Sequence, residues 1–161
     1  RVAVNLSPRQ FMQGDLVKTV ARVLAETGCD ARNLELEITE GMVMREPENA
    51  VALLQQLKDM GIHIAMDDFG TGYSSLEAFA ASSFDALKVD QSFVRDLTVN
   101  PRHRAIVRTI ISFAKDLGLL LTAEGIETDE QRALLLELGC EFGQGYWFSQ
   151  PLPADEFERL L

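Results

Sequence analysis

Residues 61–70 read Gly-Ile-His-Ile-Ala-Met-Asp-Asp-Phe-Gly, a short apolar run that ends in two carboxylates. A run of this length and composition is typical of a buried parallel strand, which we predict at His63–Asp67. The segment before it carries leucines at helical spacing and ends at Gly61, where a glycine commonly follows a helix. This stretch therefore predicts a helix that leads directly into a buried strand.

The same alternation of helical stripes and short apolar runs covers the rest of the chain. The other predicted strands are Val2–Asn5, Leu34–Ile38, Ala86–Val89, Leu119–Glu124 and Glu141–Gly145. Alternating strands and helices predict a parallel α/β sheet with right-handed crossovers, either an open doubly wound sheet or a (β/α)8 barrel. No Gly-x-Gly-x-x-Gly follows the first strand, so a Rossmann dinucleotide site is not indicated.

Length and composition restrict the possible functions. The chain has 161 residues, of which 47% are hydrophobic and 25% charged, as in one globular domain. Fifteen basic residues against 25 acidic ones give a net charge of −10, which argues against a nucleic-acid polymer as partner. The two cysteines are far apart and form no disulfide framework, which favours a reducing cytoplasm. With only two cysteines and two histidines, a zinc site is unexpected. The acidic charge is compatible with binding of divalent cations.

Polar residues stand where the predicted strands end. They are Asn5, Glu37, Asp67 with Asp68, Lys88, Glu124 and Gln144. Each alone is an ordinary helix cap or turn residue, but the carboxyl ends of barrel strands converge on one mouth. Carboxylates brought together there would repel one another unless Mg²⁺ or Mn²⁺ bound them, and a pair of such ions sharing an aspartate suits phosphodiester hydrolysis. Lys88 could orient the attacking water or hold a phosphate oxygen.

The residues at these positions resemble the EAL domain family, bacterial phosphodiesterases that hydrolyse the second messenger cyclic di-GMP. The similarity is most specific in Asp-Asp-Phe-Gly-Thr-Gly-Tyr-Ser-Ser-Leu at 67–76, and it spans almost the whole chain in family order. The matching segments are Val4–Ser7, Leu36–Glu40, Asp67–Leu76, Leu87–Asp90, Ala123–Thr128 and Gln144–Pro151.

The resemblance implies a TIM-like barrel with a two-metal site that cleaves one phosphodiester to give linear pGpG. It implies that Asn5, Glu37 and Asp67 bind one metal and that Asp67 bridges to a second, which Asp68 also binds. Mg²⁺ or Mn²⁺ would support hydrolysis, and Ca²⁺ would inhibit it. Glu124, as general base, and Lys88 would act on the attacking water.

Further residues receive roles from the same resemblance. Gln144 and Glu127 would lie near the substrate, and Glu40 would steady a loop that links metal binding to formation of a homodimer. That loop consists of Phe69, Gly70, Thr71, Gly72, Tyr73, Ser74 and Ser75. Family members often carry a GGDEF or sensory domain upstream, and many are anchored to the inner membrane with the EAL domain in the cytoplasm.

The chain departs from the family pattern in one respect. The Glu-Ala-Leu motif that names the family, with its metal-binding glutamate, should lie roughly fifty residues before Asn5 and is absent. We therefore expect residues 1–161 to be one EAL domain truncated at its N-terminus, with about six of eight strand–helix units and no appreciable hydrolysis on its own. The open barrel would leave unpaired strand edges.

Two other functions remain open at this stage. The parent protein could bind cyclic di-GMP as a sensor or regulatory module without cleaving it, although degenerate family members usually lose loop or metal residues that are intact here. Alternatively, the chain could belong to a Mg²⁺-dependent barrel lyase of the enolase type, with Lys88 as its base. The paired Asp67-Asp68 motif fits the lyase less well.

Overall fold

The computed structural model describes residues 1–45, 47–71 and 83–159, and these form a six-stranded, wholly parallel sheet. The strands are β1 (Val2–Asn5), β2 (Leu34–Thr39), β3 (His63–Phe69), β4 (Ala86–Val89), β5 (Leu120–Ala123) and β6 (Phe142–Gly143). They pair in sequence order, as neighbouring strands do in a barrel wall. All six predicted strands are confirmed: β1 and β4 have the expected bounds, β2 and β3 extend one and two residues further, and β5 and β6 are shorter than expected.

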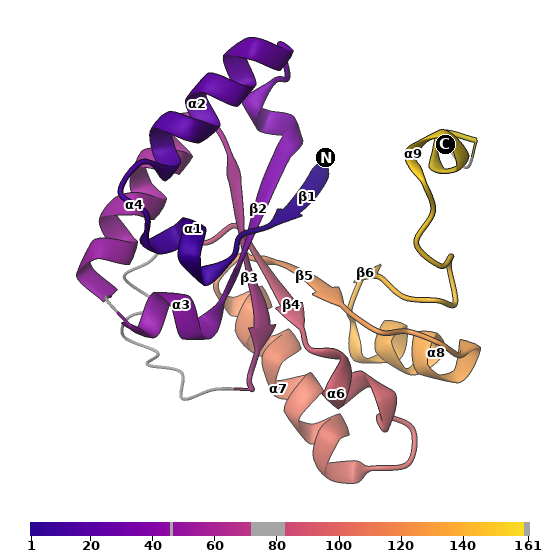
Figure 1. Cartoon of the computed structure of the whole chain (residues 1–161). Helices are drawn as coiled ribbons and strands as arrows, with labels where there is room; N and C mark the ends of the chain where they lie inside the picture. Colours follow the sequence, from indigo (N-terminus) through magenta and orange to yellow (C-terminus); the bar gives the residue numbers. More distant parts are fainter. Residues whose placement is uncertain (46, 72–82, 160–161) are drawn as a thin grey trace.

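Helices follow the strands and lie along the outside of the curved sheet, which gives a half-barrel (Figure 1). Their bounds are α1 (Pro8–Met12), α2 (Leu16–Thr27), the 3-10 turn η1 (Ala31–Asn33), α3 (Glu40–Arg45), α4 (Pro47–Asp59), α6 (Gln91–Arg95), α7 (Pro101–Asp116), α8 (Asp129–Leu138) and α9 (Ala154–Phe157). Helices α1 to α4 lie beside the first strands, α6 to α8 lie beside the last ones, and α9 stands apart.

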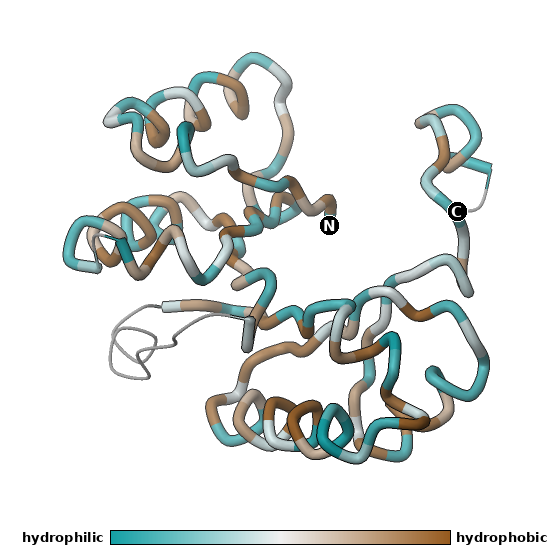
Figure 2. The backbone as a smooth tube through the Cα atoms, turned by 60° about the horizontal axis from the view of Figure 1, so that its bottom comes forward, coloured by the Kyte–Doolittle hydropathy of each residue, from teal (hydrophilic) through white to brown (hydrophobic). Residues whose placement is uncertain are grey.

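The hydrophobic core lies between the sheet and these helices. Leu36 of β2, Ile64 of β3 and Leu87 of β4 lie on the face of the sheet that the helices cover, and each is at most 2% exposed. The longer helices alternate apolar and polar residues along their turns, so each presents one apolar side to this core (Figure 2). The opposite face of the sheet carries the polar residues of the strand ends.

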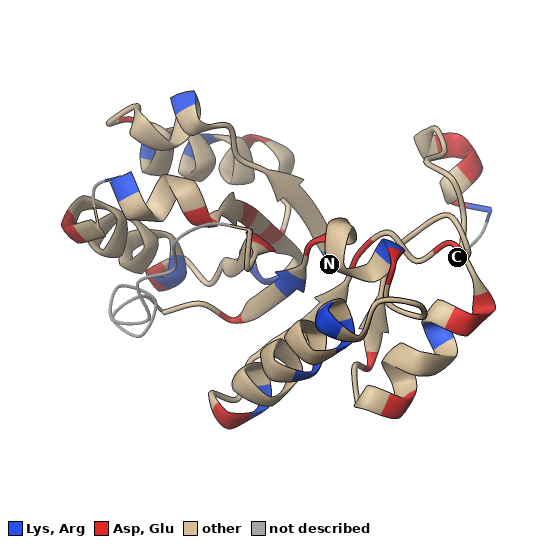
Figure 3. Ribbon diagram, turned by 90° about the horizontal axis from the view of Figure 1, so that it is seen from below, with Lys and Arg blue, Asp and Glu red and all other residues tan. Residues whose placement is uncertain are grey.

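Charged residues of both signs lie on the helices of both halves of the molecule (Figure 3). The sheet is open among the described residues, because β1 pairs with β2 alone and β6 with β5 alone. This agrees with the expected unpaired edges. None of the described helices combines the length and the apolar character that crossing a membrane requires.

Candidate active site

The strand register brings the predicted site residues to one face of the sheet. Asn5 pairs with Glu37, which in turn pairs with Ala65, two positions before Asp67. Lys88 and Glu124 fall on the same face by the alternation of β4 and β5. Because all five lie at or just past the carboxyl ends of parallel strands, they meet at one mouth of the half-barrel.

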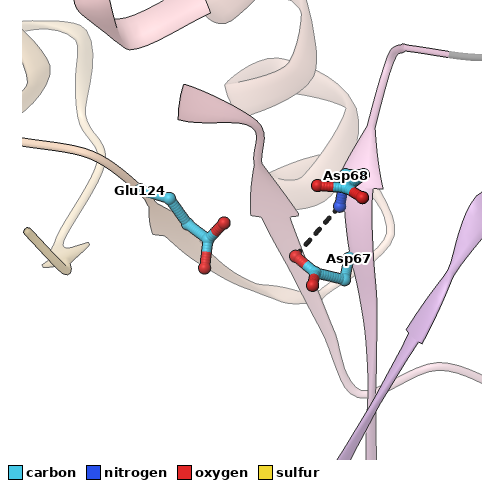
Figure 4. A group of neighbouring side chains, drawn as sticks. All are labelled: Asp67, Asp68 and Glu124. Atoms are coloured by element: carbon cyan, nitrogen blue, oxygen red, sulfur yellow. Dashed lines mark hydrogen bonds between the residues drawn. The ribbon is translucent and has the colours of Figure 1, made fainter. Parts of the chain in front are cut away.

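A bulge in β3 directs two consecutive aspartates toward this mouth. Met66 pairs with Leu87 and Phe69 with Val89, so Asp67 and Asp68 together lie opposite Lys88 alone. Consecutive side chains of a regular strand point to opposite faces, and a bulge removes that constraint. Asp68 takes φ of 55°, and its N–H donates to Asp67 Oδ1 at 2.9 Å (Figure 4).

Three carboxylates converge as a result. Asp67, Asp68 and Glu124 each offer an oxygen, and these oxygens lie within 4.8 Å of one another. Figure 4 shows the Glu124 side chain, just beyond β5, reaching toward the aspartates of β3. Asp67 is 9% exposed, so this charge is concentrated where water screens it poorly.

Lys88 is the cation of the cluster and is 5% exposed. Its Nζ donates to Glu37 Oε1 at 2.6 Å, lies 2.5 Å from Glu124 Oε1 and is 3.9 Å from Asp67 Oδ1. Glu37, which is 4% exposed, is thus held by Lys88 and stands outside the group of three carboxylates. Asn5 is exposed beside Glu37.

The electrostatics of the cluster follow from its excess of negative charge. Burial, and then the neighbouring Asp67 and Asp90, raise the pKa of Asp68 above its ordinary value. Burial likewise raises the pKa of Glu124, although the Lys88 ammonium partly offsets it. Burial alone would lower the pKa of Lys88, but hydrogen bonds to Glu124 and Glu37 outweigh it and raise that pKa.

The donor set fits a hard divalent cation. Glu37, Asp67 and Glu124 each place a carboxylate oxygen within 3.9 Å of Lys88 Nζ, and Asp68 adjoins Asp67 and Glu124. Four carboxylates thus share one ammonium, so most of their charge lacks a partner within the cluster. Carboxylate oxygens are the ligands that Mg²⁺, Mn²⁺ and Ca²⁺ favour. A bound cation would also offset the burial and the charge repulsion that raise the pKa of Asp68.

A pocket of about 370 Å³ opens beside Glu124. Its lining residues are Gln91, Glu124, Gly125, Glu127, Gln144, Gly145 and Tyr146. The backbone of β5 and β6 continues into it, since Gln144 N–H donates to Ala123 O and Ile126 N–H donates to Gln144 O. The predicted substrate residues Glu127 and Gln144 therefore share one cavity with Glu124.

The start of the loop after β3 is held from two sides. Gly70 N–H donates to Glu40 Oε2 at 3.4 Å, and the Phe69 ring stacks on Phe113 of α7 at 5.9 Å between centroids. Thr71 donates through Oγ1 to Asp68 O. The other predicted loop residues, Gly72, Tyr73, Ser74 and Ser75, lie outside the described residues.

Gln91, Gly125 and Tyr146 were absent from the sequence-based set of site residues. Gln91 begins α6 directly after Asp90 at the end of β4, so its position one residue beyond a strand-end aspartate was the available signal. Gly125 and Tyr146 follow the predicted Glu124 and Gln144 closely along the chain. Their place in the pocket depends on packing between β5, β6 and α6, which sequence spacing does not encode.

Comparisons with known proteins agree with this geometry. The EAL domain model matches residues 1–151. The cyclic di-GMP phosphodiesterase NbdA of Pseudomonas aeruginosa is 43% identical over 161 residues, which are all of this chain and 21% of NbdA. The chain spans about a fifth of the length of the curated relatives it matches.

Solved structures show the same fold with ligands. A complex of the MucR phosphodiesterase with c-di-GMP superposes with a TM-score of 0.95 at 38% identity, covering 98% of this chain and 64% of that one. The manganese and c-di-GMP complex of Klebsiella pneumoniae BlrP1 has a TM-score of 0.86 at 33% identity, covering 94% and 39%. A calcium and c-di-GMP complex of BlrP1 is equally similar. Together with the family match over residues 1–151, this establishes that the chain belongs to the EAL domain family.

Proposed function

We propose that the protein containing this chain hydrolyses cyclic di-GMP to linear pGpG in a metal-dependent reaction. The observation that carries this proposal is the bulge in β3, which brings Asp67 and Asp68 together with Glu124 opposite Lys88. Relatives and structural neighbours named as cyclic di-GMP phosphodiesterases support the choice of substrate. We further propose that the hydrolytic unit is the complete domain, including the strand with the Glu-Ala-Leu motif.

Asn5, Glu37, Asp67 and Asp68 would hold two divalent cations, with Asp67 shared between them. Bound there, Mg²⁺ or Mn²⁺ would acidify water and neutralise charge on the phosphate. Glu124 would take the proton of the attacking water, and its raised pKa brings it nearer to the working range of a general base. The Lys88 ammonium would orient Glu124 and attract a phosphate oxygen, since it already lies 2.5 Å from Glu124.

The pocket and the loop would support this reaction. Gln144 and Glu127 would contact the nucleotide, because both line the pocket that adjoins Glu124. Glu40 would fix the start of the loop through Gly70. As in the family, we propose that this loop couples the site to a homodimer interface.

The alternative functions differ in what the cluster must do. A lyase of the enolase type needs Lys88 as a neutral base, whereas two hydrogen-bonded carboxylates raise its pKa and keep it protonated. A sensor that binds cyclic di-GMP without cleaving it needs fewer intact site residues. The full set of Glu37, Asp67, Asp68 and Glu124 around Lys88 therefore favours the hydrolase.

The test is product analysis with the full-length protein. With Mg²⁺ or Mn²⁺ we expect cyclic di-GMP to be converted to pGpG, and with Ca²⁺ we expect binding without turnover. Asp67→Asn should lower turnover by at least about 100-fold, beyond what loss of a mere supporting contact costs. Asp59→Asn, an exposed change on α4, is the matched control.

Each result separates the alternatives. Binding of cyclic di-GMP without pGpG formation in Mn²⁺ would establish the sensor and exclude the hydrolase. Near-normal turnover by the Asp67→Asn protein would contradict the two-metal assignment. No binding at all would exclude both functions.

A further inference from the structure

The aromatic ring of Phe93, on α6, lies against the backbone that follows the two aspartates of β3. Gly70 comes two residues after Asp68 and has φ of +95°. An added Cβ at Gly70 would lie 3.3 Å from Phe93 Cε2 and 3.4 Å from Ile110 Cδ1, which leaves almost no room for a side chain. The turn after β3 therefore runs directly along this ring.

The hydrogen bonds of this turn hold it only loosely. Gly70 N–H donates to Glu40 Oε2 at 3.4 Å, which is long for a hydrogen bond. Thr71 donates to Asp68 O through both its N–H and its Oγ1, but these bonds lie within the turn and do not attach it to another element. Steric contact with Phe93 therefore limits where the turn can move.

Phe93 is itself held in place from two sides. Its N–H donates to Asp90 O at 3.1 Å, and its ring meets that of His103 on α7 edge-on, with 5.6 Å between the centroids. The next residue of α6, Val94, is fully buried in the core. The ring is thus a fixed wall beside the turn.

The same helix also contacts the turn that carries Glu124. Gln91 begins α6, and an added Cβ at Gly125, the residue after Glu124, would lie 2.6 Å from Gln91 Cβ. Strands β3 and β5 do not pair with each other, because β4 lies between them (Figure 1). Helix α6 therefore bridges the two strand ends that supply the three converging carboxylates.

We propose that Phe93 is a positioning residue for the metal site, and that its ring keeps the two aspartates of β3 close enough to Glu124 to share a cation. This inference rests on the proposed function, which places a divalent cation at these carboxylates. Repulsion favours moving the carboxylates apart when no cation is bound, and a turn held by the ring resists that movement. Without the ring, the turn at Gly70 can relax, and the affinity for the cation falls.

The test is electron paramagnetic resonance of Mn²⁺ added to the full-length protein. Phe93→Ala should raise the Kd for Mn²⁺ by at least about tenfold, as is usual when a residue that supports metal ligands is removed. Phe93→Leu keeps an apolar side chain beside the turn and should raise the Kd less. Leu57→Ala is the matched control, because it truncates a fully buried side chain near the end of α4 that leads into the start of β3. It should lower stability without changing the Kd.

A second pair of variants tests the same contact from the other partner. Gly70→Ala places a Cβ against the Phe93 ring and should raise the Kd for Mn²⁺, because the turn must move away from the ring. Gly118→Ala has a comparable left-handed backbone, with φ of +68°, but its Cβ would have no atom within 4 Å. It should leave the Kd unchanged, so the pair separates steric contact from backbone strain.

Turnover distinguishes positioning of the metal ligands from binding of the substrate. In Phe93→Ala, the Mn²⁺ concentration that gives half-maximal turnover should rise with the Kd for Mn²⁺. The KM for cyclic di-GMP at saturating Mn²⁺ should stay the same, since Phe93 is not among the described residues that line the pocket beside Glu124.

The outcomes separate this proposal from the proposed function. A wild-type Kd for Mn²⁺ in Phe93→Ala, or an equal rise in Leu57→Ala, would overturn the positioning role and leave the proposed function intact. If Phe93→Ala does not fold, equal Kd values for Gly70→Ala and Gly118→Ala would overturn it. A wild-type protein that binds no Mn²⁺ would instead overturn the proposed function, and the role of Phe93 with it.

Discussion

Asp68 is the one non-glycine residue with positive φ in the described part of the chain. Aspartate is among the non-glycine residues that adopt this left-handed conformation most often, and such residues concentrate at functional sites. Here the left-handed backbone turns a second carboxylate toward Asp67 and Glu124. The fold thus accepts charge repulsion at this position, which is reasonable only if a ligand compensates for it.

Burial and charge repulsion at Asp68 predict a measurable dependence of stability on pH. Its pKa is raised in the folded protein, so the folded state favours the protonated carboxyl and loses stability as pH rises through that pKa. In metal-free buffer, we expect Asp68→Asn to be more stable than wild type at pH 7. The difference should shrink as pH falls toward the ordinary carboxyl range. Urea denaturation at several pH values measures it.

With bound metal, we expect the wild-type protein to be more stable than Asp68→Asn, the reverse of the order in metal-free buffer. Saturating Mn²⁺ binds and stabilises the wild-type protein more than Asp68→Asn, because the variant lacks one carboxylate ligand. A wild-type protein that is the more stable of the two in metal-free buffer at pH 7 would contradict the account of Asp68. Asp59→Asn again serves as the control, with no expected change of this kind.

At the scale of the element, the turn after β5 positions Glu124 and Gln91 together. Gly125 has φ of +70°, and an added Cβ would meet Gln91 Cβ at 2.6 Å. Gly118 has nearly the same φ, +68°, but an added Cβ would have no atom within 4 Å. Comparing an alanine substitution at Gly125 with one at Gly118 therefore separates the cost of the left-handed backbone from the cost of steric overlap.

Gly125→Ala should lower the free energy of unfolding more than Gly118→Ala. Gly118→Ala, the control, should cost about 1–2 kcal/mol because alanine is strained in the left-handed backbone conformation. In Gly125→Ala, overlap with Gln91 should add about 1–3 kcal/mol to that cost. Chemical denaturation measures both costs, and equal costs for both substitutions would show that Gln91 is free to move away.

The elements themselves could be predicted from the sequence, because their signals are local. Capping boxes form at Ser7 with Gln10 and at Thr128 with Gln131, and Gly28 and Gly139 end their helices in the left-handed conformation. The polar strand ends also meet at one mouth as predicted. The bulge was not predictable, since consecutive aspartates in a strand should face opposite sides, and neither was the pairing of Glu37 with Lys88 in preference to the carboxylate trio.

At the scale of the whole molecule, the strands of the half-barrel differ in how many neighbouring strands they pair with. Strands β2 to β5 each pair on both sides, whereas β1 is exposed throughout and pairs with β2 alone among the described residues. Strand β6 is two residues long. Open parallel edges of this kind are prone to pairing with additional strands.

Hydrogen exchange should reflect this arrangement in the 161-residue chain. We expect the amides of β3 and β4 to exchange slowest and those of β1 and β6 fastest, because edge strands open without disrupting the core. Mass spectrometry of peptides from these strands provides the measurement. Protection of β1 equal to that of β3 would show that a further strand, from a second copy of the chain, covers the edge.

The central claim is that the carboxylates at the mouth of the half-barrel form a divalent-metal site. Electron paramagnetic resonance of Mn²⁺ added to the 161-residue chain tests it most directly, because free and bound Mn²⁺ give different signals and no turnover is needed. We predict saturable Mn²⁺ binding by the wild-type chain that Asp67→Asn weakens by at least about tenfold and Asp59→Asn leaves unchanged. Mn²⁺ binding that is absent from the wild type, or equally strong in the Asp67→Asn chain, would contradict the claim.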